Sequence, residues 1–125
     1  MAWVHKDEAG PATDAIYERI AVSGAHVPAL WRLEVANVLR TGLRRKRIDL
    51  ADRDAALDML SRLHITVHDH EDRAWTTVLS LSDRLNLTPY DAVYLDLAIR
   101  LGLPLATTDG ALADAARAEG VSVLP

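Results

Sequence analysis

The chain has 125 residues, of which 50% are hydrophobic and 26% charged, and its formal net charge is −4. This size and composition predict one domain with its own core, and the absence of cysteine excludes disulfides and thiolate metal sites and favours a reducing cytoplasm. The negative charge argues against bulk coating of nucleic acid, and no apolar run reaches the roughly 20 residues of a membrane span.

The chain opens with a predicted helix over residues 10–24, which has Pro11 near its start and Gly24 as its stop. The short segment 25–28 is predicted to be extended, and it leads into a helix over 29–47. The apolar stripe of that second helix consists of Leu30, Leu33, Val38 and Leu39.

The middle of the chain continues the alternation. A helix is predicted over 50–63, with three leucines turned inward, namely Leu57, Leu60 and Leu63. Residues 64–69 alternate as a strand does, and residues 71–85 return to helical spacing.

The clearest predicted helix covers residues 88–102. Thr88 is placed to be its N-cap, Pro89 stands at the first helical position, Asp91 at the third, and Gly102 ends it. These start and stop signals fix its bounds better than those of the other predicted helices.

The last part of the chain contains a predicted buried strand over 103–108, a helix over 109–120 and a strand over 121–124. Helices that alternate with short, nearly all-apolar strands predict an α/β fold, in which helices cover a central parallel sheet. Ligands of such folds bind beyond the carboxyl ends of the strands, and Asp109 stands at one of these ends.

Three acidic residues occupy positions where an apolar or neutral residue would be expected. Glu34 lies in line with the apolar stripe of its helix, Asp91 stands at the third position of a helix that is apolar nearly all round, and Asp109 ends a buried strand. Charges at the rim of a core need a cation or donors, and converging carboxylates suit a hard ion such as Mg²⁺ or Mn²⁺. Such an ion polarises a phosphoryl oxygen and activates water, so the acids indicate phosphodiester hydrolysis.

Each acid also has an explanation that involves no chemistry. Asp91 suits the N-terminal end of a helix dipole, and Asp109 can cap the helix that follows it. Glu34 can pair with Arg40 or Arg44. Only the joint arrangement of the three acids points to a site.

Four segments of the sequence form a known pattern: "AW" near the start, "LWRLEVANVLR" around Glu34, "LTPYDAVYLDLAIRLGLPLATTD" from Leu87 to Asp109, and the closing "A..A...GV.VL". This pattern resembles the PIN-domain ribonucleases, and most closely the VapC-type toxins of bacterial toxin–antitoxin systems. The resemblance covers essentially the whole chain and implies one PIN domain over 1–125, a three-layer fold with a central parallel sheet flanked by helices.

The resemblance also implies an activity and partners. Members of the family cleave single-stranded RNA with Mg²⁺ or Mn²⁺, form homodimers and are neutralised by a small cognate antitoxin of the VapB kind, in the cytoplasm. Glu34, Asp91 and Asp109 match the acidic catalytic and metal-binding residues of the family. Asn37 and Thr108 are the candidates for supporting those ligands.

The sequence departs from the family pattern at its start. Proteins of this family open with a hydrophobic strand that ends in an aspartate, a few residues before the "AW" found here at Ala2 and Trp3. We therefore expect a domain truncated at its N-terminus, without that strand and its acid, for which Asp7 and Glu8 come too late to substitute. A missing central strand would expose a pair of strand edges, and we expect metal affinity and turnover to fall.

A basic run follows the helix that carries Glu34, and it consists of Arg40, Arg44, Arg45, Lys46 and Arg47. It has two interpretations. The bases form either a solvated helix end that complements the dipole, or contacts with the phosphates of an RNA strand that leads into the acidic site.

Other side chains carry weaker signals. Asp96 lies about 140° round its helix from Asp91, which favours solvent or a dimer surface over the edge of the site. A zinc site is disfavoured, because no cysteine or HExxH pattern accompanies the three histidines His64, His68 and His70. Trp31 and Trp75 are expected in the core or at an interface, since both fall within amphipathic helices.

Two classes of function follow. The first is a metal-dependent endoribonuclease toxin in which Glu34, Asp91 and Asp109 hold the ion. The second is a catalytically impaired PIN-like module that dimerises or binds an antitoxin-type peptide. A nuclease that acts on DNA by the same chemistry stays open, since nothing in the sequence visibly reads a 2′-hydroxyl.

Overall fold

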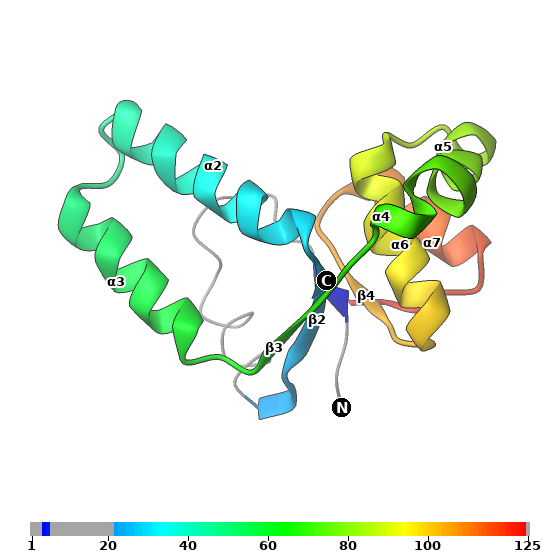
Figure 1. The fold of residues 1–125 in the computed structure, drawn as a ribbon, viewed down its shortest axis with the longest axis horizontal. Coiled ribbons are helices and arrows are strands. Elements are labelled where there is room, and N and C mark those ends of the chain that lie inside the picture. Colours follow the sequence, from blue (N-terminus) through cyan, green and yellow to red (C-terminus); the bar gives the residue numbers. More distant parts are fainter. Residues whose placement is uncertain (1–3, 6–21, 125) are drawn as a thin grey trace.

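A computed structural model describes residues 4–5 and 22–124 of the chain. The helix predicted over 10–24 lies outside the described residues, except for its last positions. Figure 1 shows a sheet with the helices α2 and α3 on one side and α4 to α7 on the other. None of the helices in the described ranges is long and apolar enough to cross a membrane.

The sheet has five parallel strands in the order β3-β2-β1-β4-β5. Their bounds are Val4–His5 for β1, Ala25–Pro28 for β2, Ile65–His68 for β3, Leu105–Ala106 for β4 and Val123–Leu124 for β5. The four strands predicted from the sequence are therefore confirmed, and so is their parallel arrangement. Because all five run the same way, their carboxyl ends meet at one edge of the sheet.

The central strand differs from the expectation of a missing first strand. Val4 pairs with His26 of β2 on one side and with Leu105 of β4 on the other. A two-residue strand thus lies at the position that we expected to be empty, and it pairs with both residues of β4 but with only one of the four residues of β2. β1 itself contains no carboxylate, and Asp7 and Glu8 lie outside the described residues.

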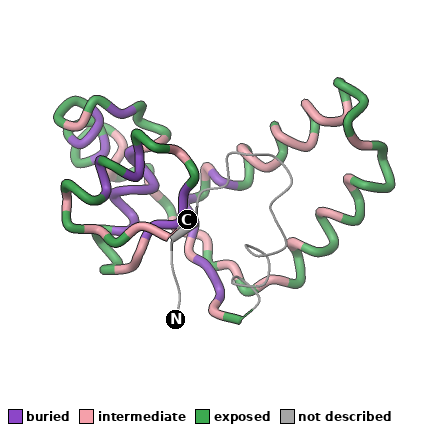
Figure 2. Tube along the Cα trace, turned by 180° about the vertical axis from the view of Figure 1, so that it is seen from behind, coloured by how far each residue is buried: buried purple, intermediate pink, exposed green. Residues whose placement is uncertain are grey.

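Helices α2 and α3 form a hairpin that projects from the sheet. They cover Leu30–Arg44 and Leu50–Ser61. Trp31 is buried at the base of the hairpin, as predicted, but α3 buries no residue, and Figure 2 shows most of the hairpin as exposed or intermediate. Two leucines predicted to face inward are exposed, Leu33 at 71% and Leu57 at 47%. Helical periodicity marks a stripe of leucines, but it cannot show whether another element covers that stripe.

The other side of the molecule contains α4 at Glu71–Arg73, a π-helical segment η1 at Ala74–Val78, α5 at Leu79–Leu85, α6 at Pro89–Leu101 and α7 at Gly110–Ala118. The single helix predicted over 71–85 is thus interrupted by a π turn. Trp75 lies in this turn and is 92% exposed, so its expected burial in the core is wrong. An interface position for Trp75 stays a prediction.

Helix α6 is the centre of the core. Every residue from Ala92 to Ala98 is buried, and the helix contacts β1, β2 and β4. Its start and stop are those predicted: the Thr88 hydroxyl accepts from the N–H of Asp91, and Gly102 ends the helix at a φ of 64°. A helix buried on all faces must satisfy every polar side chain that it carries, and two of those are Tyr94 and Asp96.

Candidate active site

The three acids predicted to act together are presented by three different elements. Glu34 lies on α2, which begins two residues after β2 ends. Asp91 lies in the first turn of α6, and Asp109 follows the end of β4 by three residues. All three are of intermediate burial. The parallel sheet therefore directs the segments that carry Glu34 and Asp109 to its carboxyl edge, where an α/β fold binds its ligands.

Glu34 is joined to α6 by a hydrogen bond. The hydroxyl of Tyr94 donates to Oε1 of Glu34, across 60 residues of sequence. Tyr94 is 0% exposed and lies one turn after Asp91. This contact connects the acid of the hairpin with the helix that carries the second acid.

Asp91 keeps both of its interpretations. Its N–H donates to the Thr88 hydroxyl at 3.2 Å, so its backbone belongs to the cap of α6. An acid in this first turn is favoured by the helix dipole whether or not it binds a metal. The position alone therefore does not separate a structural role from a catalytic one.

Asp109 has the capping role that we considered as an alternative. Its Oδ1 accepts from the N–H of Ala111 at 3.1 Å, and Asp109 is the N-cap of α7. Its own N–H donates to the hydroxyl of Thr107 at 3.1 Å. The cap holds the carboxylate in place at the edge of the sheet, which is compatible with metal binding through its other oxygen.

The two residues that we predicted to support the acids are more exposed than Tyr94 and Thr107, which contact acids in the structure. Asn37 and Thr108 are both exposed. Thr107, which we did not predict, is buried and contacts the backbone of Asp109, while its N–H donates to Leu124 at 3.2 Å. Tyr94 also escaped prediction, although a phenol inside an otherwise apolar helix is a signal that it needs a polar partner.

The three carboxylates are chemically suited to a hard cation, but they are not gathered at one point. Carboxylate oxygens are the ligands that Mg²⁺ and Mn²⁺ prefer. Within the described ranges, however, no three histidine or acidic side chains come together closely enough to hold a metal ion by themselves. Mg²⁺ commonly retains several waters and binds through one or two carboxylates together with substrate phosphates, so such a site need not be closed.

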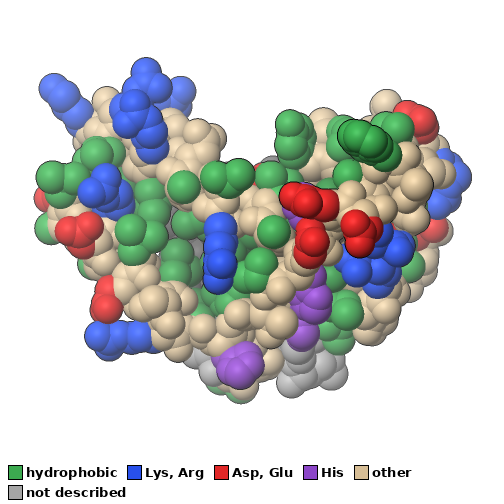
Figure 3. Space-filling model, in the orientation of Figure 1, with side chains coloured by type: hydrophobic (Ala, Val, Ile, Leu, Met, Phe, Trp, Pro, Cys, Tyr) green, Lys and Arg blue, Asp and Glu red, His purple; other side chains and the backbone are tan. Residues whose placement is uncertain are grey.

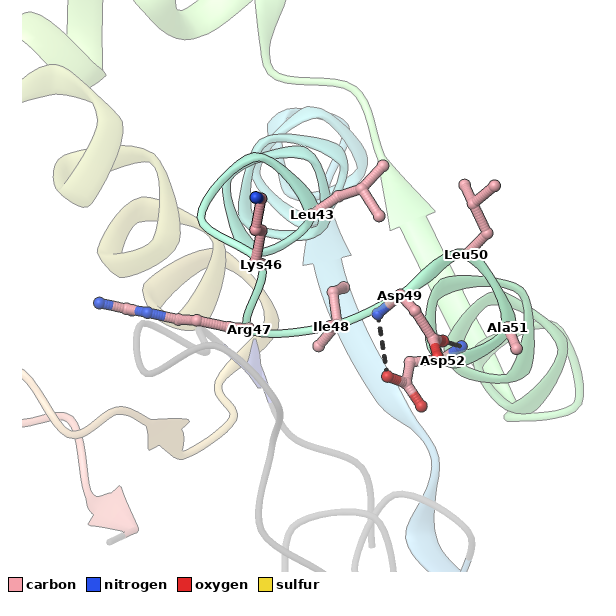
Figure 4. Close-up of a pocket in the computed structure, with 8 residues that line it drawn as sticks. All are labelled: Leu43, Lys46, Arg47, Ile48, Asp49, Leu50, Ala51 and Asp52. Carbon is pink, nitrogen blue, oxygen red and sulfur yellow. Dashed lines mark hydrogen bonds between the residues drawn. The ribbon is translucent and has the colours of Figure 1, made fainter.

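The basic run lies at the tip of the hairpin, where Figure 3 shows Lys and Arg side chains gathered. An open hollow at this tip is lined by residues 43 and 46–52, and Figure 4 shows the Lys46 and Arg47 side chains beside it. Asp49 and Asp52 form a reciprocal capping box at the start of α3, with bonds of 2.8 and 3.0 Å. Bases at the end of α2 and acids at the start of α3 therefore lie next to each other at the tip.

We expected Asp96 at solvent or at a dimer surface, and this expectation is wrong. Asp96 is buried, at 2% exposed. The Arg73 side chain donates to both of its oxygens, at 2.7 and 2.8 Å, and Arg100 lies 3.2 Å from Oδ2. The expectation rested on the angle between Asp96 and Asp91, which excludes a shared face but does not predict what covers the other face. Asp96 fastens α4 to α6.

Two of the histidines whose side chains the structure describes lie in contact. His26 on β2 and His68 on β3 lie 2.8 Å apart, from Nδ1 to Nε2. Burial, His26 and Arg100 together lower the pKa of His68. Figure 3 shows histidine and acidic side chains close together over the junction of β3 and α4. His26, which the sequence did not single out, is the partner that strand pairing supplies.

Comparison with known proteins assigns the family. The model of the PIN domain matches residues 1–118. Ribonuclease VapC9 of Mycobacterium tuberculosis (strain ATCC 25618 / H37Rv) is 36% identical over 110 residues, which cover 85% of this chain and 82% of the relative. Ribonuclease VapC3 of the same strain is 38% identical over 104 residues, which cover 81% and 72%.

A solved structure agrees with the fold. PAE2754 from Pyrobaculum aerophilum superposes with a TM-score of 0.75 over 98% of this chain and 88% of that chain, at 23% sequence identity. At this identity the likeness shows the fold alone. The match to the domain model and the two relatives carry the rest, and from them we conclude that the chain belongs to the PIN domain family, among the relatives of the VapC ribonucleases.

Proposed function

We propose that this protein is a metal-dependent endoribonuclease toxin that cleaves single-stranded RNA and is neutralised by a small cognate antitoxin. The observation that carries the proposal is the link between Glu34 and α6 through Tyr94. This link connects the hairpin acid to the helix that carries Asp91 in its first turn. The VapC names of the relatives support the same chemistry.

In the proposed site Glu34, Asp91 and Asp109 hold Mg²⁺ or Mn²⁺ at the carboxyl edge of the sheet. The ion would polarise the phosphoryl oxygen and lower the pKa of a bound water. The chain itself supplies orientation: Asp109 is fixed by its cap on α7, and Glu34 by its bond to Tyr94. Thr107 supports the backbone of Asp109, and Asn37 and Thr108 stay candidates for contacts with bound water or substrate.

The basic run provides a path for the RNA strand. Arg45 is the C-cap of α2 and follows Glu34 by eleven residues, which places it about 16 Å from Glu34 along the helix axis and only about 20° round it. Arg40 and Arg44 are turned about 120° and 80° away. We therefore propose that Arg45 contacts the phosphates of the strand that enters the site, with Lys46 and Arg47 beyond it and with smaller roles for Arg40 and Arg44.

The rest of the proposal follows the family. The chain is proposed to be one PIN domain over 1–125 with three layers, to form a homodimer and to act in the cytoplasm. Its proposed partners are the RNA substrate and a VapB-like antitoxin. A DNA substrate is an outcome that the same assay can detect.

One observation favours a second candidate, a catalytically impaired PIN-like module that binds an antitoxin-type peptide. The central strand, Val4–His5, carries no carboxylate. A site of three acids would then bind the ion less tightly than one of four, since each carboxylate adds charge and a ligand.

The test is cleavage of a labelled single-stranded RNA, with Mg²⁺, with Mn²⁺ and with chelator, beside a DNA strand of the same sequence. Asp91→Asn should lower the rate at least about 100-fold, because it removes a ligand charge. Asp114→Asn on α7 is the matched control, since that acid is exposed. A folded wild-type chain that cuts neither strand with either metal would exclude the nuclease and leave the peptide-binding module.

A further inference from the structure

The hydrogen bond between Tyr94 and Glu34 has a feature that packing does not explain. Tyr94 is 0% exposed and lies in the main core cluster together with Val27, Leu95 and Leu97. A phenylalanine would fill the same space and would need no polar partner. The hydroxyl therefore adds nothing to the apolar packing, and its place in the core requires an acceptor.

The acceptor is an acid on α2, a helix that is mostly exposed or only partly buried. Trp31 is the one buried residue of α2. Leu33, next to Glu34 in sequence, is 71% exposed, and Val35 on its other side is only partly buried. A glutamate side chain has several rotatable bonds, so a hydrogen bond from a rigid donor restricts where its carboxylate lies.

The donor, Tyr94, belongs to α6, which is more deeply buried than α2. Helix α6 is buried without a break from Ala92 to Ala98 and contacts three strands. Tyr94 comes three residues after Asp91, which puts the two on neighbouring positions of one helical face. A rigid helix thus carries one of the proposed metal ligands and holds another.

We propose that Tyr94 is a positioning residue, whose hydroxyl fixes the carboxylate of Glu34 relative to Asp91. This inference rests on the proposed function of the same site. Tyr94 is 0% exposed and its hydroxyl donates a hydrogen bond to Oε1 of Glu34, so we assign it a role through Glu34 and no direct contact with substrate. Donors to a ligating carboxylate set its orientation, and their loss typically costs 10- to 100-fold in metal affinity or activity.

The test is Tyr94→Phe, which removes one oxygen atom and keeps the ring. We expect the half-saturating Mn²⁺ concentration or kcat to worsen by about 10- to 100-fold, while KM for RNA changes little. Tyr90→Phe is the matched control, because Tyr90 lies on the same helix but is 63% exposed. Mn²⁺ binding is also measured without RNA, by electron paramagnetic resonance. Unchanged kcat and Mn²⁺ dependence in folded Tyr94→Phe would overturn the inference.

A double variant separates positioning from general destabilisation. If Tyr94 acts through Glu34, then Tyr94→Phe should add little to the loss caused by Glu34→Gln. Equal fold-losses from Tyr94→Phe in the wild-type and Glu34→Gln backgrounds would overturn the inference.

The contact itself can be read without activity. The hydroxyl proton of Tyr94 should give a slowly exchanging NMR signal that is absent in Tyr94→Phe and shifts in Glu34→Gln. A signal that Glu34→Gln leaves unmoved overturns the inference whatever the activity. A wild-type chain that neither cleaves RNA nor binds Mn²⁺ overturns the proposed function instead, so the two failures are distinguishable.

Discussion

The α2–α3 hairpin and helix α6 both carry acids of the proposed site, yet they are built in opposite ways. Helix α6 buries seven consecutive residues, Ala92 to Ala98, whereas α3 buries none. Figure 2 shows the same contrast along the whole trace. The core around α6 therefore provides most of the stability, whereas the hairpin provides charged side chains that extend away from the sheet. Four changes, from the largest expected effect to the smallest, can break or sharpen this division.

The largest effect is expected from Leu97→Ala on α6, where the side chain is fully buried. Loss of its contacts and the cavity left behind should lower the free energy of unfolding by about 2–5 kcal/mol. Leu57→Ala on α3 removes the same atoms from a half-exposed position and should cost less than about 1 kcal/mol. Urea unfolding followed by circular dichroism measures both. Equal losses would show that the hairpin is as tightly packed as the core around α6.

The next effect concerns ion pairs. Asp96→Ala leaves Arg73 and Arg100 without their buried acceptor and should cost about 3 kcal/mol. This is the low end for a broken buried pair, because both arginines are partly exposed and can reach water. Asp58→Ala removes the exposed partner of Arg62 on α3 and should cost at most about 0.5 kcal/mol. A loss for Asp96→Ala as small as that for Asp58→Ala, in the same urea titration, would mean that α4 is not held by this pair.

A smaller effect is expected on RNA. Arg45→Ala should raise KM for RNA several-fold without changing the free energy of unfolding, and should lower the slope of log K against log salt by about 0.7. Arg40→Ala, turned away from the face of Glu34, should change both less. Filter binding of RNA at several salt concentrations measures the slopes. If Arg40→Ala has the larger effect, the strand follows the opposite face of α2.

The smallest effect is a pH dependence of stability. The pKa of His68 is lowered in the folded protein by burial, His26 and Arg100, so below the ordinary histidine pKa of about 6.5 the unfolded chain binds more protons. Stability contributed by neutral His68 is therefore complete above pH 6.5 and decreases as the pH falls toward the lowered pKa.

The measurement is urea unfolding between pH 5 and pH 8, a window of about three units around the histidine pKa. His68→Gln should flatten the curve in that window. His64→Gln is the control, because His64 is exposed. A wild-type curve without a slope below pH 6.5 would contradict the lowered pKa of His68.

Sequence reasoning reached those features that are coded locally. The bounds of α6 follow from Thr88, Pro89 and Gly102, and the parallel strands follow from their apolar composition. The three acids were found for the same reason, since each breaks an apolar pattern. The resemblance to the PIN family was confirmed by the comparisons.

The features that could not be predicted from the sequence depend on which helices and strands contact one another. The burial of Asp96 requires Arg73, which comes from a different helix, and the exposure of Leu33 and Leu57 depends on what covers the hairpin. Tyr94 and Thr107 gained roles only once their hydrogen-bond partners, Glu34 and the N–H of Asp109, were known. The roles of the three acids as ligands stay predictions.

The position of β1 in the sheet determines when the site can assemble. Val4 pairs with Leu105, so the sheet closes only by joining segments about 100 residues apart. Such a long-range contact slows folding, and it cannot form during synthesis until Leu105 has left the ribosome. Asp109 follows β4 closely, so the carboxyl edge of the sheet gains its last acid at about the moment the sheet can close. A nascent chain that stops short of Asp109 therefore lacks both this pairing and one acid of the proposed site.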